Sequence, residues 1–157
     1  MFAEALFSVI GEPPSMETVS LSRSFEGDVE AVREAMLDLG PFMEAAGFDE
    51  VAVDGGEMRI TNHVGLLTIE LDLRCIETEG VLAYEQTDGI FEAMTTRYTL
   101  DSGEGTVTVT ATTDFALDVS VVGSILDGTI ISRQRRKELT AQFDYLESVA
   151  ARTGTPE

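Results

Sequence analysis

Between Glu17 and Asp118 the chain is a succession of short segments in which apolar and polar residues alternate with a period of two. Such alternation predicts half-buried β-strands, because successive side chains of a strand point to opposite faces of a sheet. The predicted strands cover 17–25, 48–54, 57–64, 66–77, 81–88, 90–100 and 106–118. From residue 48 onward the strands are separated by short Gly-containing turns. This spacing predicts an antiparallel meander.

Two other parts of the chain follow helical spacing. Asp28 is suited to cap a helix in which apolar residues recur every three to four positions, and Gly40-Pro41 is expected to end it. A further helical turn is predicted at 42–46. A much longer helix is predicted from about Val119 to Ala150. Its apolar stripe comprises Val121, Ile125, Gly128, Ser132, Arg135 or Arg136, Leu139, Phe143, Leu146 and Ala150.

The stripe of the long helix is bulky at both ends and small in the middle, at Gly128 and Ser132. Glycine inside a helix costs about 1 kcal/mol relative to alanine, so its presence usually has a steric reason. One interpretation is that these small residues leave a cavity between helix and sheet. The alternative is close packing of the helix backbone on the sheet around Gly128, with no void.

Charge is the strongest feature of the composition. The chain of 157 residues carries 29 Asp and Glu against ten Lys and Arg, a net charge of −19, and Lys137 is its only lysine. Such a surface argues against nucleic-acid binding, which needs Lys and Arg. The acids are spread evenly rather than gathered in a tract for a partner. Even spread and scarce lysine favour a cytoplasmic protein of an extreme halophile, in which salt screens self-repulsion.

The length suits a single domain. We expect residues 1–15 to form a flexible extension without a secretory signal, because the short apolar piece there has no basic flank. No apolar run approaches the roughly 20 residues that cross a bilayer, so no stable membrane insertion is expected. The oligomeric state is left open by the sequence.

Three stretches resemble the START-like superfamily, in its polyketide cyclase and lipid-transport (SRPBCC) branch. They are SRSFEGDVEAVREAMLDLGPF, TVTVTATTDFAL and GSILDGTIISRQRRKELTAQFDYLES, which are similar to the opening strand and helix, the last strand and the final helix of that superfamily. The resemblance spans about Glu17 to Ala150. With the charge, it points to an acidic member of haloarchaeal type.

The resemblance implies an α+β helix-grip (START/Bet v 1-like) fold. In it an antiparallel meander of six to seven strands wraps around a long C-terminal helix. It places the domain at 16–151, followed by a short disordered tail at 152–157. It further implies binding of a hydrophobic small molecule or lipid between sheet and helix, and some members catalyse cyclisation or dehydration of such ligands.

The candidate ligand-binding residues are those expected to face the cavity or its entrance. They are Phe42, Met43, Phe48, Met58, Ile60, Ile69, Leu71, Tyr84, Met94, Tyr98, Ile125, Gly128 and Ser132. An apolar pocket with a few polar groups is typical of small-molecule sites. Tyr84 and Tyr98 either supply hydroxyls to a ligand or are ordinary core aromatics.

No phosphate loop, zinc spacing or nucleophile elbow is present, and neither a metal nor a cofactor is expected. Cys75 is interpreted as a small residue packed in the sheet. His63, the only histidine, falls on the polar face of its strand and is expected to meet solvent. If the alternation slips at Gly65, His63 would instead pair with Glu70 at the cavity mouth as a general acid and base.

The basic run RQRRK is expected to split. Arg133 and Lys137 should be solvated or paired with nearby acids. Arg135 or Arg136 falls on or beside the stripe, where it would pair with a carboxylate or meet the anionic head of a ligand. The carboxylates considered are Glu85, Glu92 and Asp114.

Three functions remain on the sequence evidence. The leading hypothesis is a binding protein for a hydrophobic small molecule or lipid. The second is a cyclase or dehydratase in the same cavity, which requires a buried polar pair, either His63 with Glu70 or Tyr84 with Tyr98. The third is an interaction module that uses the second apolar face of the long helix, Val122, Leu126 and Ile130.

Overall fold

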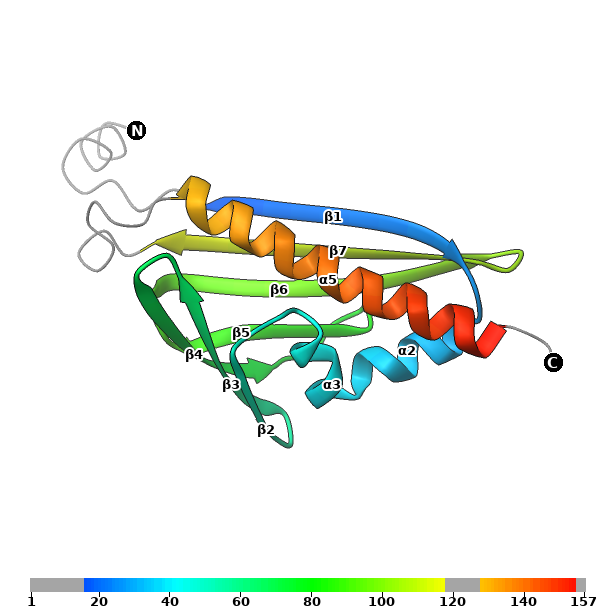
Figure 1. The fold of residues 1–157 in the computed structure, drawn as a ribbon, viewed down its shortest axis with the longest axis horizontal. Coiled ribbons are helices and arrows are strands. Elements are labelled where there is room, and N and C mark those ends of the chain that lie inside the picture. Colours follow the sequence, from blue (N-terminus) through cyan, green and yellow to red (C-terminus); the bar gives the residue numbers. More distant parts are fainter. Residues whose placement is uncertain (1–15, 118–127, 155–157) are drawn as a thin grey trace, which may run out of the picture.

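The computed structural model describes residues 16–117 and 128–154 and contains one seven-stranded antiparallel sheet (Figure 1). Its order is β1-β7-β6-β5-β4-β3-β2, so that six strands form the expected meander and the first strand pairs with the last. The bounds are β1 Glu17–Glu26, β2 Glu50–Asp54, β3 Glu57–Val64, β4 Leu67–Cys75, β5 Leu82–Asp88, β6 Phe91–Gly103 and β7 Thr106–Leu117.

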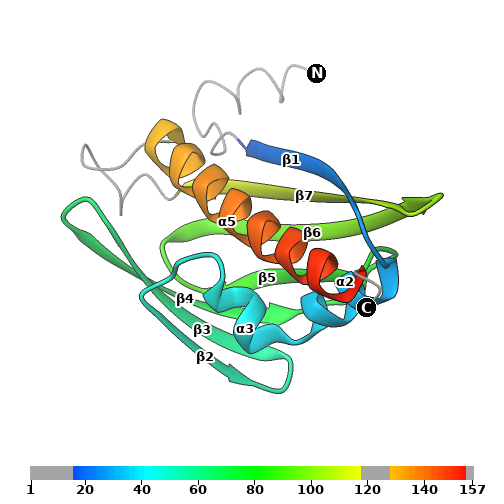
Figure 2. The same ribbon diagram turned by 45° about the vertical axis from the view of Figure 1, so that its right-hand side comes forward.

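One long helix, α5 (Gly128–Gly154), runs diagonally across one face of this sheet. Two short helices, α2 (Val29–Leu37) and α3 (Leu39–Glu44), follow β1 and lie near the C-terminal half of α5 (Figure 2). The core lies between the sheet and these helices. The arrangement is the α+β architecture that the sequence predicts.

The alternation in the strands decides which face of the sheet is covered. On β3 the side chains of Met58, Ile60, Asn62 and Val64 are buried, and the residues between them are exposed or half-buried. On the uncovered face of β1 and β7, hydroxyl side chains pair across the strands, as in Ser24 with Thr108 at 2.7 Å. A sheet with one wet face needs this pattern, because only one face packs on the core.

The first helix begins where it was predicted and ends earlier. Asp28 is its N-cap, with the carboxylate accepting a hydrogen bond from the backbone N–H of Glu30. The prediction that Gly40-Pro41 ends this helix is wrong, because α2 stops at Leu37 and both residues lie in the first turn of α3. Proline is tolerated there, since its missing N–H would have no partner within the helix.

Close contacts fix the C-terminal half of α5 against β1. Leu139, Phe143 and Leu146 are fully buried. Gly27, just after β1, has φ +153° and approaches α5 so closely that a Cβ on it would lie 2.5 Å from the Cβ of Ala150. Arg23 of β1 lies over the Phe143 ring, 5.8 Å from its centroid, and bonds Asp144 at 2.7 Å.

At the other end of α5, Gly128 lies beside β1. A Cβ at this position would meet the carboxylate of Glu17, the first residue of β1. The predicted start of the helix, 119–127, lies outside the described residues, and so do Val122, Ile125 and Leu126. The helix continues to Gly154, three residues beyond the domain end expected at 151.

Candidate functional site

A cavity of about 60 Å³ lies between α5 and the inner face of the sheet. Its apolar wall comes mainly from β3, β4, β6 and β7, with Ile131 from α5 and Phe48 from the segment before β2. Six polar residues complete it. The lining residues are Phe48, Ile60, Asn62, Val64, Ile69, Leu71, Leu73, Tyr84, Phe91, Met94, Thr113, Phe115, Ile131, Gln134, Arg135 and Glu138.

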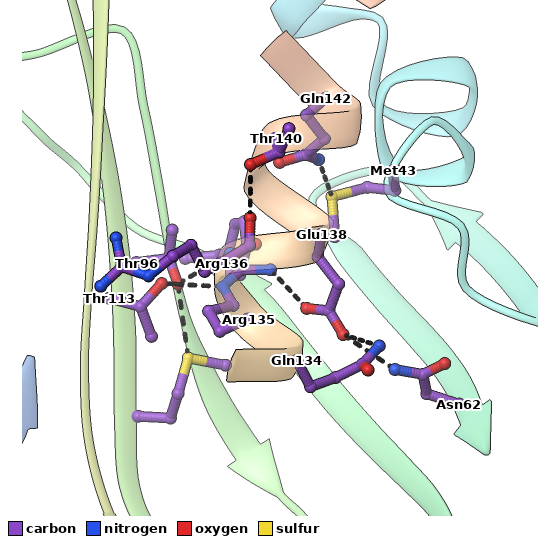
Figure 3. Close-up of polar contacts among 12 residues, drawn as sticks. Met43, Asn62, Thr96, Thr113, Gln134, Arg135, Arg136, Glu138, Thr140 and Gln142 are labelled. Carbon is purple, nitrogen blue, oxygen red and sulfur yellow. Dashed lines mark hydrogen bonds and ion pairs between the residues drawn. The ribbon is translucent and has the colours of Figure 1, made fainter. Parts of the chain in front are cut away.

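Arg135 of α5 is the centre of the polar wall (Figure 3). It is 8% exposed. Its Nε donates to Thr113 Oγ1 at 2.9 Å, and its Nη2 donates to the hydroxyls of Tyr84 at 2.7 Å and Thr96 at 3.3 Å. The guanidinium therefore ties the helix to β5, β6 and β7 at once. A planar group with five donors is suited to such divergent bonds.

Glu138, one helical turn later, balances this charge. Its Oε1 accepts from Arg135 Nη1 at 2.9 Å. Its Oε2 accepts from Asn62 Nδ2 at 2.8 Å and Gln134 Nε2 at 3.1 Å. Figure 3 shows the carboxylate between Arg135 on one side and the two amides on the other. A buried ion pair persists only when its remaining polar atoms are bonded in this way.

A second chain of bonds leads from Arg135 through two tyrosines toward α3. The hydroxyls of Tyr84 and Tyr98 lie 3.3 Å apart, and Tyr98 donates to Gln142 Oε1 at 2.6 Å. Gln142 Nε2 then donates to the carbonyl of Phe42 at 3.1 Å. Among the described residues, every buried side-chain nitrogen and oxygen has a partner.

Burial raises the pKa of the Tyr98 hydroxyl well above its ordinary value, and Tyr84 adds to the shift while Arg135 opposes it. Tyr98 is therefore a neutral donor at physiological pH. Burial alone would lower the pKa of the Arg135 guanidinium, but the oxygens of Tyr84, Tyr98 and Glu138 raise it further, above the ordinary value. Arg135 is therefore a permanent cation, and with the Glu138 carboxylate the wall carries a balanced pair of charges.

Six of the residues predicted from the sequence come together in the cavity: Phe48, Ile60, Ile69, Leu71, Tyr84 and Met94. Others are buried in the core beside it, namely Phe42, Met43, Met58 and Tyr98. Phe42 and Tyr98 stack edge to face, with ring centroids 5.2 Å apart. Gly128 and Ser132 do not line the cavity, and Ile125 lies outside the described residues.

Of the two polar pairs considered for catalysis, only the tyrosines face inward. His63 bonds Thr68 at the surface through Nδ1, and its side chain is 60% exposed. Glu70 is exposed on the next strand. The predicted solvent exposure of His63 is confirmed, and the alternative of a His63–Glu70 pair at the cavity mouth is wrong, because the alternation does not slip at Gly65.

The basic run splits as expected, but the buried arginine has a different partner. Arg135 is buried, whereas Arg133, Arg136 and Lys137 are exposed on the outer side of α5. The expected partners on the sheet are wrong for Arg135, since Glu85 bonds Arg74, Asp114 lies near Arg97 and Glu92 is exposed. The partner is Glu138, on the same helix.

Sequence reasoning missed most of the polar wall. Asn62 and Thr96 alternate in register with the apolar residues of their strands and are buried, but a single polar residue on an apolar face carries no indication of its partner. Glu138 and Gln142 follow Arg135 by three and seven residues, which puts all three on one side of a helix. That spacing was the available signal for a buried polar seam.

Cys75 is not among the residues that line the cavity. Cys75 is half-buried at the end of β4, and burial raises the pKa of its thiol, which keeps it protonated. Across residues 16–117 and 128–154, no group of three or more His, Cys, Asp or Glu is placed to hold a metal ion. No helix in the same ranges is long and apolar enough to cross a membrane.

Known proteins resemble this chain in structure and not in sequence. Neither the protein-family models nor the curated proteins give a match. Among solved structures, a START superfamily protein from Mycobacterium smegmatis superposes with a TM-score of 0.65 at 10% identity, over 86% of this chain and 97% of the other. The chain has the START-like helix-grip fold.

Two enzymes share this START-like fold. The Zhui aromatase/cyclase from Streptomyces sp. R1128 matches with a TM-score of 0.69 at 16% identity, over 90% of this chain and all of the other. Norcoclaurine synthase from Thalictrum flavum, solved with dopamine and hydroxybenzaldehyde, matches with a TM-score of 0.60 at 11% identity, over 91% of each chain. Identities this low establish the fold alone.

Proposed function

We propose that the chain binds a small, uncharged, mainly apolar molecule in the cavity between α5 and the sheet. The observation that carries this proposal is the make-up of the cavity: an apolar wall that faces a buried polar wall in which Arg135 and Glu138 neutralise each other. Such a combination is typical of small-molecule sites. Two neighbours with the same fold support it. One is an aromatase/cyclase, and the other is a synthase that was solved with dopamine and hydroxybenzaldehyde.

The size of the cavity narrows the choice of ligand. Its 60 Å³ is well below the roughly 150 Å³ of an apolar cavity that holds benzene. A ligand must therefore displace part of the wall. Phe48, Phe91 and Gln134 are the lining residues that can move most easily, because they are half-buried and the other lining residues are buried. A small molecule needs much less of this movement than a lipid with a long chain, so we favour the small molecule.

The second candidate function is an enzyme, a cyclase or dehydratase that acts in the same cavity. The observation that favours it is the inward-facing pair of Tyr84 and Tyr98, with hydroxyls 3.3 Å apart and Arg135 beside them. Turnover of an unsaturated polyketide analogue by the wild-type protein, lost on Tyr84→Phe, would move the assignment from a binding protein to an enzyme.

The acidic composition supports the proposal that the protein works at high salt concentration. With 29 acidic against ten basic residues, the protein is suited to the cytoplasm of an extreme halophile, where concentrated salt screens its charge. Binding should therefore be measured in about 2 M KCl.

The test of the binding function is calorimetry with benzene, ethylbenzene and propylbenzene, with dodecanoate as a charged lipid. We expect the neutral aromatics to bind and dodecanoate to be rejected. Ile69→Phe, which fills the cavity, should weaken aromatic binding at least about tenfold, whereas Leu21→Phe, at a half-buried position on β1 outside the cavity, should not. No binding of any probe, or equal binding by the filled variant, would refute a ligand cavity.

A further inference from the structure

The directions of the hydrogen bonds around the two tyrosines show which hydroxyl can serve a ligand. The carbonyl of Phe42 can only accept, so the Gln142 side chain must turn its Nε2 toward it and its Oε1 toward Tyr98. An amide oxygen also can only accept. Tyr98 therefore gives its single proton to Gln142, and none is left for another partner.

Tyr84 is in the opposite position. Its oxygen accepts a bond from Arg135 Nη2 at 2.7 Å, and a guanidinium never accepts in return. Since the Tyr98 proton is used on Gln142, the bond between the tyrosines must run from Tyr84 to Tyr98. At 3.3 Å it is long for a bond between two hydroxyls, which usually measures about 2.7–2.8 Å. The hydrogen bond that Tyr84 donates to Tyr98 is therefore weak.

Tyr84 is also the tyrosine that lines the cavity, and Tyr98 is not among the lining residues. We propose that the Tyr84 hydroxyl, held and polarised by Arg135, is the hydrogen-bond donor to the ligand, and that the ligand is an uncharged apolar molecule with one carbonyl oxygen. Binding would replace the long bond to Tyr98 with a short bond to the carbonyl. This proposal rests on the proposed binding function.

The charges of the wall support an uncharged acceptor over an anion. Arg135 is already neutralised by Glu138, whose two oxygens receive three bonds. A carboxylate or phosphate on the ligand would bring a second negative charge beside Glu138 without a second cation to balance it. A ketone, aldehyde, ester or quinone oxygen needs only the donor that Tyr84 offers.

The test compares two ligands of nearly equal shape, acetophenone and α-methylstyrene, in which a carbonyl oxygen replaces a methylene group. By calorimetry in about 2 M KCl, we expect the wild-type protein to prefer acetophenone by about three- to tenfold, the usual worth of one hydrogen bond. Tyr84→Phe should remove the preference, which is measured as the ratio of the two affinities within one variant. Circular dichroism shows whether the variant is folded.

Two matched variants separate Tyr84 from the other tyrosines. Tyr98→Phe should keep the preference, because it removes the competing acceptor and not the donor. Tyr145→Phe, half-buried on α5 and outside the cavity, should behave as the wild-type protein. A preference that survives in Tyr84→Phe, or that is lost only in Tyr98→Phe, would overturn the assignment.

Failure of this proposal is distinguishable from failure of the proposed function. If neither probe binds, the binding function fails. If both bind with equal affinity to the wild-type protein, the cavity stands and the role of Tyr84 falls. Should Tyr84→Phe not fold, the carbonyl ¹³C resonance of labelled acetophenone decides: a downfield shift on binding to the wild-type protein supports a hydrogen bond, and no shift overturns it.

Discussion

Within residues 16–117 and 128–154, Arg135 and Glu138 are the two charged residues that are buried, at 10% and 8% side-chain exposure. Together they bond to residues of β3, β5, β6 and β7, so each side chain connects α5 to the sheet as well as to the other charge. Most of the other ion pairs, such as Arg74 with Glu85, lie at the surface. Surface pairs contribute little to stability, whereas a buried charge left without its partner is costly.

We therefore expect Glu138→Ala to lower the free energy of unfolding by about 3–5 kcal/mol, because it leaves Arg135 buried without a counter-charge. Replacing both residues, as Arg135→Met with Glu138→Leu, should lower the free energy of unfolding by less than Arg135→Met alone or Glu138→Leu alone. Urea unfolding at fixed pH and salt measures each variant. Arg74→Met is the surface control, with an expected effect of about 0–1 kcal/mol. Additive effects of the two buried changes would contradict this account.

Among the elements, the approach of β1 to α5 depends on a single glycine. Gly27 combines a positive φ with backbone that lies against Ala150. Arg23 adds contacts to Phe143 and Asp144, both about two turns earlier on α5. Because α5 carries Arg135, Glu138 and Gln142, its placement at this end also determines where the polar wall meets the sheet. The packing of β1 against α5 thus affects the position of the polar residues in the site.

Gly27→Ala should lower the free energy of unfolding by about 1–3 kcal/mol, because the new methyl group meets Ala150 and the backbone is strained. Gly40→Ala in α3 is the matched control. A Cβ at Gly40 meets nothing within 4 Å, and alanine favours helix, so a neutral or slightly stabilising effect is expected. Thermal unfolding followed by circular dichroism compares the two. Equal effects would show that Gly27 is not a point of close packing.

The whole molecule carries a net charge of −19 around a neutral, buried site. In the part of the chain that the structure describes, exposed ion pairs such as Arg74 with Glu85 gain stability at low salt. Carboxylates repel one another over longer distances. With 29 acids against ten bases, the repulsion outweighs the attraction. The balance depends on ionic strength, because the Debye length falls from about 10 Å at 0.1 M to about 3 Å at 1 M salt.

We expect the melting temperature to rise as NaCl increases from 0.05 to 1 M at neutral pH, in a scanning calorimetry series. The same series at about pH 4, where a large share of the carboxyl groups is protonated, should show a much smaller rise. The comparison separates charge screening from a general effect of salt on apolar burial. A melting temperature that falls with salt, or that rises equally at both pH values, would contradict the charge-repulsion account.

The sequence by itself determined the order of elements, the inward face of each strand and the fold class, because these depend on local periodicity. It also indicated that one of Arg135 and Arg136 is buried, and that His63 meets solvent. Gly128 was interpreted as a cavity residue, but it lies beside the Glu17 carboxylate and is not among the residues that line the cavity. The space beside a glycine depends on what packs there.

Only the tertiary structure decided the polar wall. Asn62, Tyr84, Tyr98 and Thr113 come from four strands, and their bonds with Arg135, Glu138 and Gln142 form because α5 crosses the sheet at one particular place and angle. No spacing along the chain encodes that crossing. Local periodicity determines which face of an element a side chain occupies. The partner of that side chain depends on the packing of segments that are far apart in the sequence.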